Sequence, residues 1–185
     1  MEELGRKSVE EVKQSDKTPI VVVLENIRSA YNVGSVFRTA DAFLIQSICI
    51  IGYSAKPPHK EIKKTALGAE DSVGWKYFKT SPEAIKELRN DGFKVFAIEQ
   101  TEGSLHLQTL KFRQEEKIAL IFGNEVTGVE QATIQLCDGS IEIPQLGMKH
   151  SLNIATSVGV VLWELVRTRM PLQRSPSGPS SKGEF

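Results

Sequence analysis

The sequence predicts an α/β domain in which a mostly parallel sheet is flanked by helices. Short runs of apolar, mostly β-branched residues recur along the chain, as is typical of strands that are covered on both faces. Stretches with apolar residues at helical spacing lie between these runs. Strands that alternate with helices in this way form parallel sheets with helices on both faces.

The strands are predicted at residues 20–24, 47–51, 93–98, 118–122 and 141–143. Apolar spacing predicts a first helix around residues 33–40. Ser81 as the N-cap and Pro82 at the first helical position predict another helix, and Gly92 can end it in the left-handed conformation. The last helix is predicted over about residues 151–169, before Pro171.

The predicted organisation is a polar N-terminal appendage (residues 1–17), one folded domain (18–172) and a disordered tail rich in Ser, Pro and Gly (173–185). Lys plus Arg and Asp plus Glu number 23 each, so the formal net charge is zero. This balance argues against a uniformly basic nucleic-acid-binding protein but not against a local basic patch.

We expect a soluble, cytoplasmic protein. No apolar run approaches the ~20 residues that cross a bilayer, and the N-terminus lacks the apolar core of a secretory signal. Cys49 and Cys137 form no CxxC motif and are predicted as reduced core residues. The three histidines are scattered without metal-ligand spacing, so no metal site is predicted.

Familiar nucleotide-binding motifs are absent. No predicted strand is followed by GxGxxG. Gly123 and Gly128 have the glycine spacing of a P-loop, but Val129 and Glu130 stand where Lys and Ser or Thr are required. The P-loop interpretation is therefore rejected.

The first unusual segment is residues 26–41, directly after the first predicted strand. Arg38 lies in an otherwise apolar helix, one and a half turns after Asn32. A long cation on a mostly buried element needs a partner or an anionic ligand. An Arg38–Asp41 surface pair is the simpler alternative, and the segment alone does not decide between the two.

The second segment, residues 120–128, begins as an apolar strand and continues into a polar loop. Ligands of parallel α/β sheets bind beyond the carboxyl ends of the strands, where Gly123 would admit a close approach. A capping box of Thr127 and Glu130 would explain those two residues structurally. It would leave Gly123, Asn124 and Glu125 unexplained.

The third segment, residues 141–155, again leads from a strand through a glycine-bearing loop into a helix. Ser151 could be an ordinary N-cap of that helix. Asn153 is a poorer choice for an apolar helix start, which suggests a hydrogen-bonding role.

Together, these segments resemble the three motifs of the SpoU (TrmH-type) branch of the SPOUT RNA methyltransferases, over about residues 18–168. The resemblance implies methyl transfer from S-adenosylmethionine to a ribose 2′-hydroxyl in tRNA or rRNA. It also implies a SPOUT-type fold with a C-terminal trefoil knot, and a homodimer with the site at the subunit interface. The resemblance departs from the common pattern at Gln145 and Ala155.

The resemblance assigns roles to individual residues. Arg38 would orient the target phosphate and stabilise the developing alkoxide, because a guanidinium stays protonated and is a poor base. The residues that would anchor Arg38 and the ribose are Asn32, Glu125, Ser151 and Asn153. The cofactor pocket would be formed by Ile98, Glu99, Gln100, Thr101, Gly123, Asn124, Glu125, Ile143, Gln145, Ser151 and Leu152.

Positive charge for RNA binding is concentrated in one segment, where Lys60, Lys63 and Lys64 are the expected phosphate contacts. Trp75 in the same segment could stack on an unpaired base. The alternative is an ordinary solvated loop with Trp75 packed in the core.

The leading hypothesis is an RNA ribose 2′-O-methyltransferase. It favours tRNA, because the chain has no separate N-terminal RNA-binding domain. A non-catalytic RNA-binding protein with the same fold is the alternative, and a small-molecule-binding α/β protein unrelated to RNA is a third. The last helix and the loops around it, with Trp163 and Val166, are expected to supply the dimer contact. A face buried within the monomer would explain the same pattern. Neither a membrane nor a metal partner is expected.

Overall fold

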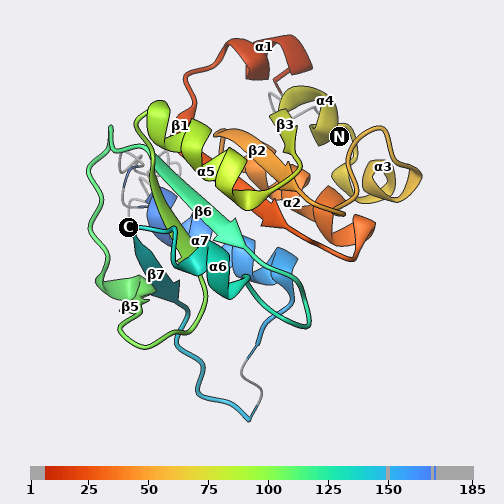
Figure 1. Cartoon of the computed structure of the whole chain (residues 1–185). Coiled ribbons are helices and arrows are strands. Elements are labelled where there is room, and N and C mark those ends of the chain that lie inside the picture. Colours follow the sequence, from red (N-terminus) through yellow and green to blue (C-terminus); the bar gives the residue numbers. More distant parts are fainter. Residues whose placement is uncertain (1–6, 149–150, 168, 170–185) are drawn as a thin grey trace, which may run out of the picture.

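The computed structural model describes residues 7–148, 151–167 and 169, and its core is a seven-stranded sheet in the order β3-β2-β1-β6-β4-β7-β5 (Figure 1). All strand pairings in this sheet are parallel, which confirms the predicted fold class. The strands are β1 (Thr18–Glu25), β2 (Ile45–Ile51), β3 (Gly74–Phe78), β4 (Lys94–Ile98), β5 (Leu105–His106), β6 (Ile118–Phe122) and β7 (Gly139–Glu142).

The five predicted strands all form, whereas β3 and β5 were not predicted. Both of these strands lie at an edge of the sheet. The first three residues of β3 are exposed, so its sequence lacks an apolar run. Strand β5 is only two residues long and both are exposed. Edge strands need no covering on two faces and therefore leave no buried-strand pattern in the sequence.

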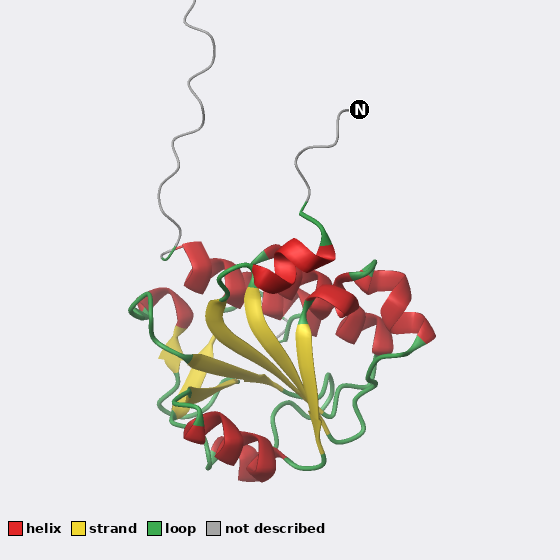
Figure 2. Cartoon of the chain, turned by 90° about the horizontal axis from the view of Figure 1, so that it is seen from above, coloured by secondary structure: helices red, strands yellow, loops and turns green. Residues whose placement is uncertain are grey.

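Helices cover both faces of the sheet (Figure 2). The helices are α1 (Val9–Gln14), α2 (Ala30–Ala42), α3 (Lys60–Ala66), α4 (Ala69–Ser72), α5 (Ser81–Asn90), α6 (Gln131–Ile134) and α7 (Ile154–Arg167), with a 3₁₀ turn at Leu107–Thr109. Helices α2, α3, α4 and α7 bury their apolar faces in one core, and α5 and α6 pack against the other.

Strand β1 lies in the middle of the sheet and contributes to both cores. Ile20, Val22 and Leu24 belong to the core beneath α2 and α7. Val21 and Val23 face the opposite core. Each fully buried aliphatic side chain of this kind contributes about 1.5–3 kcal/mol of hydrophobic stabilisation. The central strand therefore tolerates no polar position until its carboxyl end is reached.

The start of α5 differs from the prediction. Thr80, not Ser81, occupies the N-cap position, and Ser81 is the first helical residue. The Ser81 hydroxyl instead donates to the buried carboxylate of Glu25 at the end of β1. Gly92 has the predicted positive φ, +84°, directly after the helix.

Helix α1 is a short polar helix closed by a capping box in which Ser8 and Glu11 exchange hydrogen bonds. It contains no buried residue. Residues 1–6 and the predicted tail at 173–185 lie outside the described residues. The trefoil knot stays a prediction, because its path would include residues 149–150 and the chain end, which the structure does not describe.

Both cysteine thiols are unpaired and packed against the core beneath α5. Burial raises the pKa of Cys49 to about 12 and that of Cys137 to about 11. Both thiols therefore stay protonated near neutral pH and are poor nucleophiles. Their role is packing, as the sequence predicted.

Helix α3 is docked on α2 at a glycine. A Cβ atom at Gly34 would come within 3.0 Å of the Thr65 hydroxyl and of the Ile62 carbonyl oxygen. The Thr65 hydroxyl donates across the same contact to the Tyr31 carbonyl at 2.9 Å. The missing side chain thus allows the backbones of the two helices to approach each other.

We predict that Gly34→Ala lowers the free energy of unfolding by about 1–3 kcal/mol, because the Ile62 carbonyl is backbone and cannot rotate away. Urea unfolding followed by circular dichroism measures this change. Gly159→Ala in α7 is the matched control, since a Cβ there meets nothing within 4 Å. Equal stability of Gly34→Ala and the native protein would contradict the docking role of Gly34.

Candidate active site

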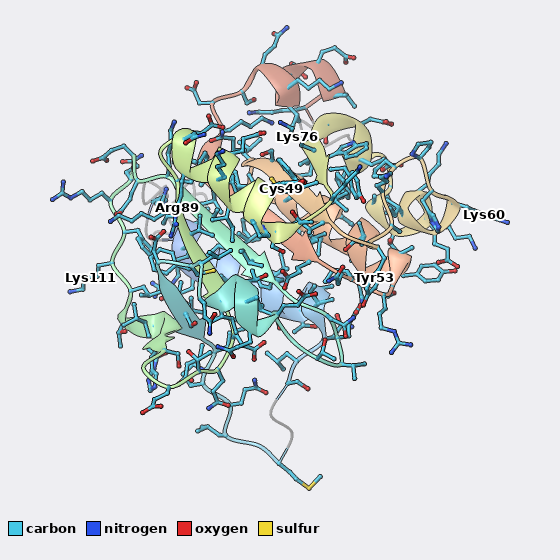
Figure 3. All side chains as sticks on the ribbon, in the orientation of Figure 1. Cys49, Tyr53, Lys60, Lys76, Arg89 and Lys111 are labelled. Carbon is cyan, nitrogen blue, oxygen red and sulfur yellow. The ribbon has the colours of Figure 1, made fainter. Side chains whose placement is uncertain are left out.

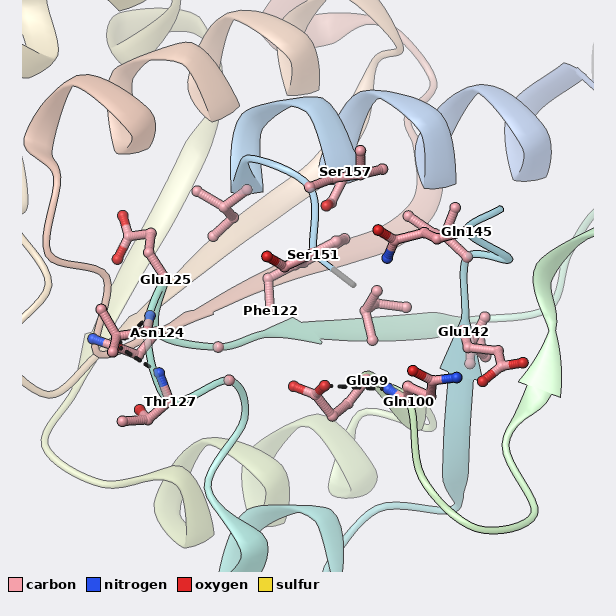
Figure 4. A pocket seen from close by; sticks show the side chains of 18 of the residues that line it. Glu99, Gln100, Phe122, Asn124, Glu125, Thr127, Glu142, Gln145, Ser151 and Ser157 are labelled. Carbon is pink, nitrogen blue, oxygen red and sulfur yellow. Dashed lines mark hydrogen bonds between the residues drawn. The ribbon is translucent and has the colours of Figure 1, made fainter. Parts of the chain in front are cut away.

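A cavity of about 460 Å³ opens at the carboxyl edge of the sheet, beyond β4, β6 and β7 (Figure 4). Its walls are the loops after these three strands and the first turn of α7. The lining residues are Ile98, Glu99, Gln100, Phe122, Gly123, Asn124, Glu125, Val126, Thr127, Gly128, Ile141, Glu142, Ile143, Pro144, Gln145, Ser151, Leu152, Ile154 and Ser157. The volume lies in the range of small-molecule and cofactor sites.

The cavity brings together the residues predicted to hold a cofactor, with one exception. Thr101 does not line it. The Thr101 carbonyl instead accepts a hydrogen bond from the Ser104 N–H and closes a turn further along the chain. Residues that the sequence reasoning missed, such as Val126 and Ser157, lie between predicted positions and had no motif to single them out.

The loop after β6 (residues 123–130) is a compact turn. The backbones of Asn124 and Gly128 exchange hydrogen bonds of 2.9 and 3.0 Å. The Asn124 side-chain oxygen also accepts from the N–H groups of Val126 and Thr127. A Cβ at Gly123 would come within 3.0 Å of the backbone of Gly128, so this turn requires glycine there.

The capping box expected from Thr127 and Glu130 does not form. Glu130 itself is the N-cap of α6, and no side chain caps that helix. Its carboxylate oxygen Oε1 accepts from the Asn26 amide at 2.6 Å instead. The Thr127 N–H donates to the Asn124 side chain, so it is not free to donate to Glu130 as a capping box requires.

Glu99 closes the cavity wall between β4 and the β6 loop. Its Oε2 atom accepts from the Val129 N–H at 3.0 Å. A Cβ at Gly128 would come within 3.0 Å of that oxygen, and Gly128 has a φ of +71°. The carboxylate thus holds a glycine turn that no other residue could form without strain.

Glu125 joins the second motif to the first. Its carboxylate accepts from the N–H groups of Arg28 and Ser29 at 2.9 and 3.3 Å, and from the Asn32 amide at 2.9 Å. Burial acts to raise the pKa of Glu125, but these donors outweigh it, and the pKa is held below its ordinary value. The carboxylate is therefore ionised at neutral pH and is a poor proton acceptor.

Asn153 joins the third motif to the same cluster. Its amide donates to the Asn32 side-chain oxygen at 3.2 Å, so Asn32 lies between Glu125 and Asn153. The Asn153 oxygen accepts from the Ala155 N–H at 2.9 Å and caps α7. Asn153 is thus the N-cap, and the expectation that Ser151 caps this helix is wrong. Ser151 lines the cavity instead.

Arg38 lies apart from this cluster in its own chain. It is exposed on α2, roughly 9 Å along the helix axis from Asn32. It lines a separate hollow between α1, α2 and α4, and it is absent from the cavity wall. The alternative surface pair does not form among the described residues, since Asp41 accepts from the Ser72 hydroxyl instead.

Asn26 is a site residue that sequence reasoning missed. It has a φ of +55° directly after β1. Its side chain donates to Glu130 and accepts from the Tyr53 N–H, and its carbonyl accepts from the Asn124 amide. The available signal was an Asn at a strand end, a residue that tolerates the left-handed conformation.

Residues 19–163 match the model of the SpoU rRNA Methylase family. The chain belongs to the SpoU family. It is 30% identical over 171 residues to a tRNA (guanosine(18)-2′-O)-methyltransferase of Thermus thermophilus, an alignment that covers 91% of this chain and 84% of the relative. A 23S rRNA (guanosine-2′-O-)-methyltransferase of Vibrio parahaemolyticus is 25% identical, with coverage of 91% and 67%.

Solved structures of SpoU proteins have the same fold. The TrmH/SpoU tRNA modifying enzyme of A. aeolicus superimposes with a TM-score of 0.76 at 24% identity, over 87% of this chain and 80% of that one. An AdoMet-bound rRNA methyltransferase from Sinorhizobium meliloti gives 0.77 at 25% identity. That alignment covers 86% of this chain and 61% of the other, so this SpoU chain spans less than two thirds of the second protein.

The described residues show neither a membrane-spanning helix nor a metal-binding cluster. None of their helices is long and apolar enough to cross a membrane. They contain no group of three or more His, Cys, Asp or Glu side chains placed to hold a metal ion.

We predict that Glu125→Gln destabilises the protein by about 1 kcal/mol at pH 7, after allowance for the solvent exposure of the carboxylate. A carboxyl whose pKa is lowered by folding stabilises the folded state above its unfolded pKa. This stabilisation is lost as the pH falls through the folded pKa. The difference between the two proteins should therefore shrink below about pH 4.5.

Urea unfolding at pH 7 and at acidic pH measures this difference. Glu102→Gln is the matched control, because Glu102 is exposed and makes no hydrogen bond or ion pair with the described residues. A pH-independent difference for Glu125→Gln would mean that the charge on the carboxylate does not hold the loop.

Proposed function

We propose that this protein is an S-adenosylmethionine-dependent methyltransferase that modifies a ribose 2′-hydroxyl in RNA, with tRNA as the favoured substrate. The observation that carries the proposal is the Glu125–Asn32–Asn153 chain of hydrogen bonds, which joins three distant segments at the rim of one cavity. Family membership supports the reaction, and the 30% identity to a tRNA-modifying relative supports the choice of tRNA.

The cavity walls suit S-adenosylmethionine. Ile98, Ile143 and Leu152 offer apolar surface for the adenine, and the Gly123 turn lets a ligand approach the backbone. Glu99 and Gln145 offer polar groups to the same cavity from different sides (Figure 4). The bound cofactor supplies a methyl group already activated by its sulfonium. The protein's contribution is then to position the ribose and stabilise charge, which together can lower a barrier by several kcal/mol.

The proposed role of Arg38 requires a second protomer. In its own chain, Arg38 does not line the cavity and lines a different hollow. A homodimer would bring the Arg38 of one protomer to the cavity of the other. The guanidinium would stay protonated, orient the target phosphate and stabilise the alkoxide. The hydroxyl proton would leave to a phosphate oxygen or another acceptor, because Glu125 is a weak base.

The dimer contact is proposed at the exposed side of α7. Val160 and Trp163 are 39% and 53% exposed there. Val166, the other residue expected at this contact, is only 4% exposed and packs in the monomer core, so that expectation is wrong. The Trp163 ring lies 6.3 Å from that of Phe43, at the end of α2, which links this face to the helix that carries Arg38.

We propose that α3 supplies phosphate contacts. Lys60, Lys63 and Lys64 are all exposed on it, and none is engaged in an ion pair with another described residue. Trp75 is 37% exposed at the edge strand β3, so it is neither fully open for stacking on a base nor packed in the core. Phosphate contacts of this kind make RNA affinity fall steeply with salt.

We predict that Arg38→Ala lowers kcat/KM for methylation of tRNA at least about 100-fold, as expected for loss of a group that stabilises transition-state charge. The affinity for S-adenosylmethionine should stay within about two-fold, because Arg38 does not line the cavity. Transfer of a radiolabelled methyl group to unmodified tRNA and calorimetry measure the two quantities. Arg113→Ala is the control for loss of an exposed arginine. Undiminished transfer by Arg38→Ala would remove this residue from the reaction.

A mixing experiment tests whether the site is shared between protomers. Ser157→Phe should block the cavity that Ser157 lines, while Arg38→Ala leaves the cavity intact. Each variant alone should be inactive. Unfolded and refolded together, they should recover about a quarter of the native activity, because half of the dimers contain one complete site out of two. Recovery of no activity by folded, mixed dimers would contradict a shared site.

A further inference from the structure

Tyr53 is an exposed aromatic residue held rigidly beside the proposed site. It lies in the loop between β2 and α3 (residues 52–59), and 65% of its surface is exposed. Its hydroxyl oxygen accepts from the Asn124 amide at 2.7 Å, and its N–H donates to the Asn26 side chain at 3.3 Å. An exposed ring fixed at both ends has no evident packing role, because one of its faces stays open to solvent.

Hydrogen bonds join the loop that carries Tyr53 to the β1–α2 loop (residues 26–29). The Ile27 N–H donates to the Ser54 hydroxyl at 2.7 Å, and that hydroxyl is buried. The Asn26 N–H donates to the Ile51 carbonyl at 3.3 Å. Tyr53 is therefore positioned relative to the same loop whose Arg28 and Ser29 N–H groups bind Glu125. Such pre-organisation lowers the entropy cost of binding a ligand.

The Tyr53 hydroxyl retains a proton to donate. Its oxygen is the acceptor in the bond from Asn124, and it donates to no other described residue. The Asn124 amide points away from Glu99 and Gln145, so Tyr53 lies on the outer side of the β6 loop rather than in the cofactor cavity (Figure 4). A free O–H beside an open ring is suited to a nucleobase or phosphate, which are acceptor-rich.

Exposed basic side chains lie on the loop that carries Tyr53, on the β1–α2 loop and on the helix that follows Tyr53. Tyr53 and Lys60 extend from the same side of the molecule (Figure 3). The exposed basic residues of the β1–α2 loop, the β2–α3 loop and α3 are Arg28, Lys56, Lys60, Lys63 and Lys64. Exposed aromatic rings combined with basic side chains are the common means of binding unpaired nucleotides, whereas an A-form duplex hides its base faces.

We propose that Tyr53 stacks on an unpaired base of the substrate RNA next to the target nucleotide, and that its hydroxyl donates to that nucleotide. This inference rests on the proposed function and adds to it a class of substrate. The methylated ribose lies in a loop or single-stranded segment, with a neighbouring base turned out of the stack. Lys60 and Arg28 then neutralise the flanking phosphates.

The first experiment measures binding of unmodified tRNA in the presence of S-adenosylhomocysteine at several salt concentrations. Tyr53→Leu should weaken binding about ten-fold with an unchanged salt slope, because stacking involves no counterion release. Lys60→Ala, the comparison variant, should reduce the slope by about one. Tyr53→Phe keeps the ring and should lose much less affinity than Tyr53→Leu. Equal tRNA affinity of Tyr53→Leu and the native protein would overturn the proposal.

The second measurement separates stacking from an indirect effect through Asn124. Tyr53→Leu should raise the KM for tRNA by a larger factor than it weakens binding of S-adenosylmethionine. Tyr53→Phe removes the same hydrogen bond from Asn124 and should therefore share any loss of stability, but it should keep most of the RNA affinity. Loss of cofactor affinity to the same extent as RNA affinity would mean that Tyr53 only supports the β6 loop, and this would also overturn the proposal.

A photochemical readout locates the contact directly. Irradiation of the native protein with 4-thiouridine-substituted tRNA should give a nucleotide adduct on the peptide that contains Tyr53. Adducts confined to other surfaces would contradict the proposal. Failure of the native protein to methylate any tRNA would reject the proposed tRNA activity itself, whereas normal methylation by Tyr53→Leu would reject only the role of Tyr53.

Discussion

The site depends on one ionised carboxylate. Glu125 binds two backbone N–H groups and the Asn32 amide, and Asn32 in turn binds Asn153. These contacts join segments that are 93 and 121 residues apart in the sequence. A neutral carboxyl could not accept all three donors with the same strength, since bonds to a charged acceptor are roughly twice as strong. The rim of the cavity is therefore held by electrostatics and not by apolar packing.

The β6 loop lies between the proposed cofactor cavity and the proposed RNA-binding surface. On one side, Glu99 binds the Val129 N–H and closes the cavity wall. On the other side, the Asn124 amide binds the Asn26 carbonyl and the Tyr53 hydroxyl. The glycine turns of this compact loop bring both sets of hydrogen bonds into one short segment. The loop thereby fixes where Tyr53 lies relative to the cavity wall.

The sequence predicted the layers better than the ends of the elements. Runs such as residues 118–122 are buried on both faces and leave an unmistakable apolar pattern. Helix ends are set by single hydrogen bonds for which several polar residues compete. Ser151 and Asn153 could each cap α7, and the bond from Asn153 to Asn32 favours the latter by fixing its position. Thr127 does not cap α6, because Glu130 occupies the N-cap position and the Thr127 N–H donates to the Asn124 side chain. The long-range bond between Asn26 and Glu130 leaves no signal in the sequence, although an Asn at a strand end is itself a hint of a left-handed residue.

The position of Arg38 explains why the proposed site needs residues from two chains. Helix α2 has one end in the hydrogen-bonded cluster, at Asn32, and carries Arg38 further along, where the cavity of the same chain is out of reach. The helix is rigid and is clamped to α3 at Gly34, so bending it toward the cavity would break a backbone-to-backbone contact. A charged guanidinium is stable on the surface without a described partner. Packing within one chain, however, does not require an arginine at this position. In the proposed homodimer, the cavity of a second protomer would lie against this surface, and the exposed Trp163 ring would lie at the contact.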